Sequence, residues 1–377
     1  MGRCYSTTRR EVSEPQSSLN RTESIEKMKR RTFLRFTTTA VASALAAPYV
    51  CAQSKKFAGI TLRVNGFGGL YDETLKKCVG APLEEKYGLK IQFIAGSQSA
   101  DLVKLIANKD NPPFDLFQAD SAYMVELLKA GVIEEIKAPD VPNIKRILPE
   151  FREYGDRGVP YSVASSIPVY NSRYIKQPLI SYSDIARPDL AGRAVIPTPV
   201  QDSISLYLLG IADENGGSIS NMEPAFQVMA AAKPNIVALA QTTVAELQMF
   251  ESEEVYAGIF WDSRAHELRT KGFPIVTVIP PKGIYSICSY FNVVKGMKYP
   301  EAAHAFAEQL LSDEGMSGLP RALGIGVTTD VKLPEDIQKN LVYNSPERIA
   351  LKKKVDWEKW MADRGARIER VNKIIRT

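Results

Sequence analysis

The sequence has few cysteines and histidines, and beyond residue 52 it has no long apolar segment. Four cysteines and two histidines occur among 377 residues. They form no close Cys/His cluster, which argues against a structural zinc site. No apolar run after residue 52 approaches the roughly 20 residues that a membrane-spanning helix needs. We therefore expect the mature chain to be soluble and to hold no metal or cofactor.

The mature part of the chain also lacks an excess of charge of either sign. The whole sequence carries 48 Lys and Arg against 43 Asp and Glu, but residues 1–52 hold nine of the basic and four of the acidic side chains. The remaining residues carry 39 of each sign. The basic pI therefore belongs to the N-terminal region and indicates neither nucleic-acid nor anionic-membrane binding. The chain that remains is long enough for two ordinary domains.

Residues 1–52 have the form of an export signal. Arg30 and Arg31 form a twin-arginine motif, a mildly apolar segment follows, and small residues predict cleavage after Ala52. Residues 1–27 are polar and without periodicity. We therefore expect that the start codon is assigned too far upstream. The sequence therefore predicts export to the periplasm by the twin-arginine pathway. A disordered basic tail on a cytosolic protein is the alternative.

Three cysteines raise questions that the sequence leaves open. Cys51 stands at the expected end of the signal and is a candidate for lipidation. Cys78 and Cys288 remain in the mature chain, and the periplasm is a compartment in which they could form a disulfide. Twin-arginine cargo is exported already folded, so folding cannot depend on that bond.

The first part of the mature chain alternates between strand and helix patterns. Strands are expected at 58–65, 89–94 and 114–118, and helices at 72–87, 96–108 and 121–131. This order predicts a parallel sheet covered by helices. Ligands bind such sheets at the carboxyl ends of the strands, beside helix N-termini. Three loops are therefore expected to converge on a ligand: 66–69, 97–99 and 119–121.

An extended segment, residues 158–174, separates this run from a second one between residues 183 and 283. It is rich in β-branched and aromatic residues, and Pro160 and Pro168 exclude a helix. We expect it to cross between two α/β lobes, with an ordinary edge strand as the alternative. Residues 284–294 are extended again and are predicted to form a second crossing. The first crossing would carry three small hydroxyls, on Ser162, Ser165 and Ser166.

The C-terminal part of the sequence has helical periodicity. A helix is expected at 300–312, with Ala303, Phe306 and Leu310 on one face. Residues 347–376 are helical and charged, and the run of three lysines at 352–354 is expected to be a solvated face.

In this order, the pieces resemble the bacterial extracellular solute-binding proteins of ABC importers, in the type II group that includes polyamine, ferric-iron and thiamine binders. The stretches that carry the resemblance span nearly all of residues 56–315: 96–97, 114–117, 127–133, 158–161, 169–171, 189–193, 258–261 and 298–303. The resemblance implies an α/β fold of two lobes, joined by two crossing strands, with a cleft between them. It places lobe I at 53–163 plus 285–345, lobe II at 164–284, and C-terminal helices packed on the lobes at 346–377.

The resemblance also implies a binding function without catalysis. Loops of both lobes contact a small-molecule solute only when the lobes close, so the solute favours the closed state. An ABC permease in the inner membrane then recognises the closed conformation. The expected protein is a periplasmic monomer that delivers its solute to the permease.

The class of solute follows from a partial match to the polyamine binders. Asp202 and the pair Trp261-Asp262 lie where that subfamily places ligand contacts, and carboxylates with aromatic faces suit ammonium groups. Ser289 replaces an aspartate of that subfamily, and Ile287 replaces a tryptophan. An amine-bearing, polyamine-like solute is therefore expected.

Other solutes remain alternatives. Thiamine also suits an aromatic face, and Arg264 could pair with Asp262 or with an anionic or phosphonate solute. Ferric iron is disfavoured because no Tyr-Tyr pair occurs in the sequence.

Ten side chains are expected to bind the solute: Phe67, Gln98, Asp120, Ser165, Asp202, Ser203, Tyr207, Trp261, Asp262 and Tyr285. Several have an ordinary structural alternative. Asp120 and Asp202 could cap the helices that follow them. Trp261, Tyr207 and Tyr285 could belong to the core.

Two further functions are compatible with the same architecture. A thiaminase-like enzyme would place a cysteine nucleophile in the cleft, but neither Cys78 nor Cys288 has an activating neighbour in the sequence. A periplasmic sensor partner would bind solute for a receptor, and the sequence does not separate it from a transport component.

Overall fold

The computed structural model describes residues 55–376, which form one compact unit. The predicted twin-arginine signal, the cleavage after Ala52 and the candidate lipidation at Cys51 lie outside these residues. None of the helices within 55–376 is long and apolar enough to span a membrane.

The first run of alternation folds as predicted, into a parallel sheet. β1 (Thr61–Gly66) pairs in parallel with both β2 (Lys90–Ala95) and β3 (Leu116–Asp120). β9 (Ser286–Val293) runs antiparallel to β3. The helices of this part are α1 (Gly69–Leu75), α2 (Ala81–Tyr87), α3 (Gln98–Ala107) and α4 (Ser121–Ala130). A π-helical turn, Lys76–Gly80, joins α1 to α2, so the helix predicted at 72–87 begins three residues earlier and contains this wider turn.

The crossing strand is β4 (Val159–Asn171), and it belongs to both halves of the sheet. Its residues 159–165 pair with β9, whereas residues 166–170 pair with β7 (Ala257–Trp261). β8 (Ile275–Thr277) also pairs with the second half of β4. The alternative of an ordinary edge strand is therefore wrong. We call the half built on β1, β2, β3, β9 and residues 159–165 lobe I, and the half built on the remaining strands lobe II.

Lobe II repeats the parallel arrangement. β5 (Ala194–Pro197) lies between β6 (Ile236–Ala240) and β7, parallel to both. The sheet order is β2-β1-β3-β9-β4-β7-β5-β6, with β8 beside β4. The helices are α5 (Asp202–Glu214), α6 (Glu223–Ala232), α7 (Thr243–Glu251) and α8 (Asp262–Thr270). The sequence patterns did not predict β6, a five-residue strand whose side chains are mostly half-buried.

The core follows the predicted apolar faces. Leu75, Val79 and Leu83 are buried beneath the lobe I sheet, and α9 (Pro300–Leu310) buries the face predicted for it. α10 (Asp313–Leu323) packs on α1. Short 3₁₀ helices occupy Pro142–Arg146, Pro149–Phe151, Tyr182–Ala186, Pro188–Leu190 and Lys233–Asn235.

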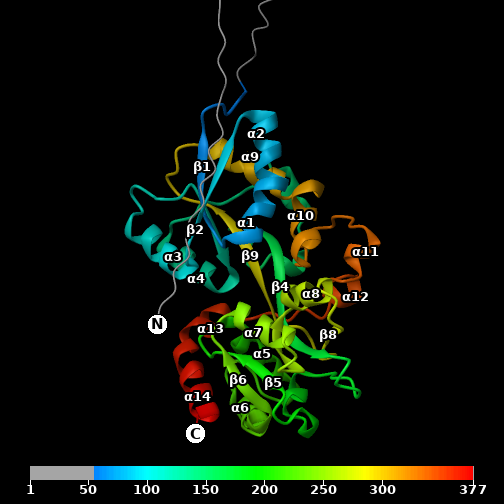
Figure 1. Ribbon diagram of the computed structural model, residues 1–377. Helices are drawn as coiled ribbons and strands as arrows, with labels where there is room; N and C mark the ends of the chain where they lie inside the picture. Colours follow the sequence, from blue (N-terminus) through cyan, green and yellow to red (C-terminus); the bar gives the residue numbers. More distant parts are fainter. Residues whose placement is uncertain (1–54, 377) are drawn as a thin grey trace, which may run out of the picture. The chain divides into compact units, whose positions relative to one another are not determined.

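The C-terminal segment contacts both lobes (Figure 1). α13 (Trp357–Ala362) packs on α4 of lobe I, and α14 (Arg364–Arg376) packs on α6 of lobe II. Two short helices, α11 (Glu335–Gln338) and α12 (Pro346–Ile349), precede them. The expectation of a solvated face at 352–354 is wrong for Lys352, whose side chain is 2% exposed and pairs with Glu153 at 2.6 Å.

Candidate functional site

The three loops predicted to converge do so at one edge of the lobe I sheet. The N–H of Gly96 donates to the carbonyl of Gly66 at 3.2 Å, which joins the first loop to the second. The N–H of Asp120 donates to Oε1 of Gln98 at 3.2 Å, which joins the second loop to the third. The carboxyl ends of β1, β2 and β3 therefore meet, as expected for parallel strands.

A chain of hydroxyls lines this edge. Tyr71 on α1 donates to the hydroxyl of Tyr161 on β4 and shares a second hydrogen bond with Ser162, both at 3.0 Å. Tyr161 in turn donates to Oε1 of Gln118 at 2.6 Å. The ring of Phe67 packs edge-on against Tyr71, with centroids 5.0 Å apart. The ring of Phe67, on the loop 66–69, therefore packs against a tyrosine whose hydroxyl is held by two hydrogen bonds.

Asp120 is the acidic member of this wall. Ser289 on β9 donates to its carboxylate at 2.7 Å. Burial, with a smaller contribution from the negative charge of Asp202, raises the pKa of Asp120 to about 6, and the Ser289 hydroxyl opposes that rise. Within residues 55–376, no Lys or Arg forms an ion pair with Asp120. We call Phe67, Tyr71, Ser162, Asp120 and Ser289 the lobe I wall.

Asp120 is the residue directly before α4, which is the position that a helix cap would occupy. Its carboxylate makes no capping hydrogen bond to the helix. The capping alternative is wrong in this respect, because the carboxylate is directed to Ser289 instead.

Asp202 lies on the facing side, in the first turn of α5. Gln201, not Asp202, is the residue before this helix, so capping does not explain Asp202. Nε of Arg364, at the start of α14, lies 3.4 Å from its carboxylate, and Nη2 of Arg364 donates to the carbonyl of Val200 at 2.7 Å. Burial raises the pKa of Asp202, while the charges of Arg364 and Arg367 oppose the rise.

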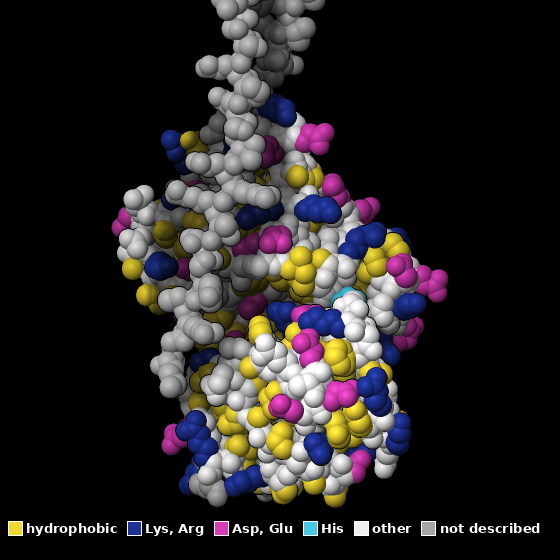
Figure 2. Space-filling model, in the orientation of Figure 1, with side chains coloured by type: hydrophobic (Ala, Val, Ile, Leu, Met, Phe, Trp, Pro, Cys, Tyr) yellow, Lys and Arg dark blue, Asp and Glu magenta, His cyan; other side chains and the backbone are white. Residues whose placement is uncertain are grey.

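Tyr123 on α4 connects the two sides electrostatically. Burial raises the pKa of its hydroxyl to about 12, the charges of Asp202 and Asp120 add to the rise, and Arg364 opposes it. Charged groups of lobe I, lobe II and the C-terminal segment therefore all influence the pKa of this hydroxyl. On the face seen in Figure 2, acidic and basic side chains lie along the hollow between the lobes.

Asp262 and Ser165, two further predicted residues, lie in a buried polar cluster at the crossing strand. Asp262 is 4% exposed, and its Oδ2 has no hydrogen-bond partner within the described chain. Burial raises the pKa of Asp262 to about 7, and the N–H of Ser165 opposes the rise. The hydroxyl of Ser165 bonds to that of Ser286 at 2.9 Å, and Ser286 bonds to Tyr343 at 2.5 Å.

The remaining predicted residues lie in more ordinary surroundings. Tyr207 is fully buried and donates to the carbonyl of Tyr182 at 2.7 Å. The hydroxyl of Tyr182 accepts a hydrogen bond from the N–H of Tyr285 at 3.1 Å. Ser203 is buried, and its carbonyl accepts from Ser166. Trp261 is half-buried at the end of β7 and packs against the main core. Tyr207 and Tyr285 are thus joined to Tyr182, not to Asp120 or Asp202.

Sequence reasoning missed three side chains around this site: Tyr71, Tyr123 and Arg364. Tyr123 lies within a predicted helix and Tyr71 lies directly before one, and an aromatic residue at such a position is normally assigned to the core. Arg364 lies beyond residue 315, where the resemblance to solute-binding proteins ended, and it approaches Asp202 from 162 residues away. Tyr71 and Tyr123 could have been identified because each follows closely after a loop that connects a strand to a helix.

Neither remaining cysteine is arranged as a nucleophile. Cys78 and Cys288 are buried and free, so the predicted alternative of a disulfide between them is not formed. Burial raises the pKa of Cys78 to about 11, and burial also raises the pKa of Cys288. Both thiols therefore stay protonated at neutral pH.

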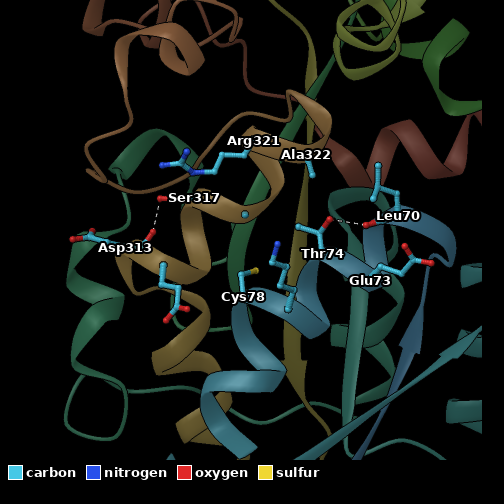
Figure 3. A pocket seen from close by; sticks show the side chains of 11 residues that line it. Leu70, Glu73, Thr74, Cys78, Asp313, Ser317, Arg321 and Ala322 are labelled. Atoms are coloured by element: carbon cyan, nitrogen blue, oxygen red, sulfur yellow. Dashed lines mark hydrogen bonds between the residues drawn. The ribbon is translucent and has the colours of Figure 1, made fainter. Parts of the chain in front are cut away.

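A separate cavity of about 790 Å³ lies between α1 and α10 of lobe I (Figure 3). Leu70, Cys78 and Ala322 contribute apolar surface, and both signs of charge line it, as on Glu73 and Arg321. Within this cavity Ser317 donates to the carbonyl of Asp313, and Thr74 donates to that of Leu70. None of the predicted site residues lines it.

Comparisons with known proteins agree with this architecture. A family model described as bacterial extracellular solute-binding protein matches residues 79–342. No significant match was found among curated protein sequences.

Solved structures share the fold over nearly their whole length. An ABC transporter protein from Clostridium perfringens is 23% identical, with 84% of this chain and 99% of that chain covered and a TM-score of 0.71. The spermidine/putrescine ABC transporter substrate-binding protein PotD of Streptococcus pneumoniae is 17% identical, with 84% and 99% covered and a TM-score of 0.70. FutA of Trichodesmium, in complex with iron and citrate, is 16% identical, with 84% and 98% covered and a TM-score of 0.66.

These likenesses confirm the predicted type II periplasmic-binding-protein fold. The family model covers well over half of the 377 residues and includes the crossing strand β4. The chain therefore belongs to the family of bacterial extracellular solute-binding proteins.

Proposed function

We propose that this protein is the periplasmic solute-binding component of an ABC importer and that it captures a small amine-bearing solute between its lobes. The observation that carries the choice of solute is Asp120, a carboxylate at the carboxyl end of β3 that has no basic partner in the described chain. An ammonium group beside it would form a charge-assisted hydrogen bond. Structures with the same fold come from ABC transporters, and one of them is a spermidine/putrescine-binding protein.

The surroundings of Asp120 suit an amine in two further ways. Phe67 and Tyr71 bring aromatic rings to the same wall, and aromatic faces attract cations. The Ser162 and Ser289 hydroxyls supply acceptors for the remaining ammonium N–H groups.

Closure would follow from contacts made by both lobes. A solute on Asp120 of lobe I would lie near Asp202 of lobe II, so it would gain contacts with lobe II when the lobes approach. Binding would then shift the population toward the closed state, which the permease would recognise. Export by the twin-arginine pathway, from the signal at Arg30 and Arg31, is part of the same proposal.

Other functions have less support from these residues. Thiamine, which also carries a cation, remains an alternative for the aromatic wall. Ferric iron has less support because no Tyr-Tyr pair occurs in the sequence. A thiaminase-like reaction would need an ionised thiol, which the burial of Cys78 and Cys288 opposes.

The test is a thermal-shift screen followed by calorimetry on the purified protein. The panel contains putrescine, spermidine, thiamine, ferric citrate and simple anions. A ligand at about a hundred times its Kd adds about 2.7 kcal/mol of stability, which raises Tm by several degrees. We expect an amine to produce this shift and Asp120→Asn to weaken its binding about 100-fold.

Asp110→Asn serves as the matched control, because Asp110 is an exposed acid on a loop away from the cleft. It should leave the affinity within about twofold of the original. Stabilisation by ferric citrate or by anions alone would contradict the amine proposal, whatever the variants do.

A further inference from the structure

A further cavity, of about 320 Å³, lies between lobe II and the segment that connects α11 to α12 (Figure 1). Its lobe II side is formed by Arg269 near the end of α8, by β8 and by Ile279. Its other side is formed by residues of the connecting segment and by Arg348 of α12. None of the ten predicted solute-binding residues lines this cavity, and neither does any residue of the lobe I wall.

The charged side chains that line this cavity are all basic. They are Arg269, Lys339 and Arg348, and no Asp or Glu is among the lining residues. Within residues 55–376, none of these three side chains forms an ion pair. The cavity between α1 and α10 differs, because acidic and basic side chains line it together, as on Glu73 and Arg321. Positive charges that share a cavity repel one another, and a bound anion would relieve this repulsion.

The acidic side chains of the neighbouring elements compensate this charge only in part. Burial lowers the pKa of Arg269, and the charge of Asp262 opposes that shift. Because the pKa of Asp262 is itself raised to about 7, its carboxyl is only partly ionised at neutral pH. Glu267 of α8 is paired with two other basic side chains. Glu347 of α12 and both acids of α11 are exposed and do not line the cavity.

Both sides of the cavity are held in place by contacts within the protein. Nη1 of Arg269 donates to Oγ1 of Thr277 at 2.7 Å, which leaves the O–H of Thr277 available to a ligand. On the other side, Nδ2 of Asn344 donates to the carbonyl of Lys339 at 3.4 Å. Val342 anchors the same segment in the main core. The donors and charges are therefore positioned before a ligand binds.

We propose that this cavity is a second ligand site, which binds a small oxyanion with two or more negative charges, such as phosphate or a dicarboxylate. Guanidinium groups bind carboxylates and phosphates through paired, charge-assisted hydrogen bonds. The volume lies near the lower limit of the roughly 300–1,000 Å³ that is typical of ligand pockets, so the ligand is a small molecule. This site is separate from the proposed amine site and does not depend on it.

The test is calorimetry on the purified protein with inorganic phosphate, sulfate and succinate, and with acetate as the monovalent comparison. All titrations are made at one ionic strength, because added salt by itself screens the repulsion. We expect a divalent anion to bind at least about tenfold more tightly than acetate. Arg348→Gln should weaken that anion at least about tenfold, as expected for the loss of a hydrogen bond from a charged group. Lys339→Gln should weaken it less, because Lys339 is more exposed.

Lys332→Gln is the matched control, because Lys332 is an exposed lysine of the same C-terminal region that does not line the cavity. It changes the net charge equally and should leave the affinity for the anion within about twofold of the original. A second measurement is the Tm of each protein in dilute salt without phosphate, sulfate or succinate. Arg348→Gln should raise this Tm because it removes repulsion, whereas a purely structural role of Arg348 would lower it.

The outcomes separate this site from the cleft. Phosphate, sulfate and succinate that all bind no more tightly than acetate would overturn the proposal, and so would equal affinities in Arg348→Gln and the original protein. Loss of anion binding in Arg364→Gln, with Arg348→Gln unaffected, would assign the anion to the cleft instead. Asp120→Asn should weaken only the amine and Arg348→Gln only the anion, so the failure of either proposal is recognised independently of the other.

Discussion

The two sides of the cleft hold their acidic groups in different ways. In lobe I, Asp120 is surrounded by the hydroxyl of Ser289 and by aromatic rings, and nothing basic pairs with it in residues 55–376. In lobe II, Asp202 is paired with Arg364. A hydroxyl stabilises an ionised carboxylate less than a guanidinium does. Asp120 should therefore attract a bound cation more strongly than Asp202 does. The difference supports the proposal that a cation binds to the lobe I side.

The C-terminal segment is anchored differently to the two lobes, and this difference should produce the largest effect. Lys352→Met leaves Glu153, which is 13% exposed, without its cationic partner, and should lower the free energy of unfolding by about 3 kcal/mol. Arg370→Met removes an exposed pair with Glu223 and should cost less than about 1 kcal/mol. Urea unfolding at neutral pH measures both. Equal losses would show that burial of the ion pair does not decide its importance here.

The contributions of Asp120 and Asp202 to the binding of an amine can be compared directly. Asp120→Asn should weaken an amine about 100-fold, which corresponds to about 2.7 kcal/mol. Asp202→Asn should weaken the same amine less than about tenfold, because Arg364 already neutralises much of its charge. Calorimetry on the two variants gives the ratio. If Asp202→Asn had the larger effect, the assignment of the cation to lobe I would be reversed.

Asp262 allows a comparison by pH. Its folded-state pKa of about 7 lies above the ordinary value of 3.8, so the folded protein takes up this proton before the unfolded chain does. The folded state should therefore gain about 2.5 kcal/mol from this group as the pH falls from 8 to 5. Asp262→Asn removes that gain, whereas the contributions of Asp120 and Asp202 remain.

The measurement is the difference between the unfolding free energies of the original protein and Asp262→Asn at each pH. Because both proteins share every other titrating group, the difference isolates Asp262. A difference that stays constant from pH 8 to pH 5 would show that its carboxyl titrates normally.

The smallest expected effects come from matched helix caps in the two lobes. Ser312 accepts from the N–H of Gly315 at the start of α10, and Thr242 accepts from Ala245 at the start of α7. Replacing either by Ala should cost about 1 kcal/mol. If the lobes unfold together, both variants shift one transition equally by circular dichroism. Two separate transitions, each moved by one variant, would show that the lobes unfold independently.

Much of the architecture could be predicted because it depends on local patterns. The alternation in residues 58–136 indicated the parallel sheet, and the proline-containing extended segment at 158–174 indicated the crossing strand. The convergence of three loops followed from the same reasoning, since parallel strands bring their carboxyl ends to one edge. The short strand Ile236–Ala240 was missed, because its five residues give too little periodicity to identify.

The site could be predicted only in part. The sequence led to Asp120 through the expected convergence of three loops, and to Asp202 through the partial match to the polyamine binders. It also led to Tyr207, and only the packing of Tyr182 against its ring shows how completely that side chain is buried. Spacing along the chain does not tell which face of a helix another element will cover.

By itself, the sequence determined the α/β fold, the strand β4 that both halves of the sheet share and the three loops that meet at one sheet edge, because hydrophobic periodicity and turn residues act over short distances along the chain. Only the tertiary structure decided which charges meet. Arg364 reaches Asp202 across 162 residues, and Lys352 reaches Glu153 across 199. Such pairs form because packing of the C-terminal helices on both lobes brings distant side chains together.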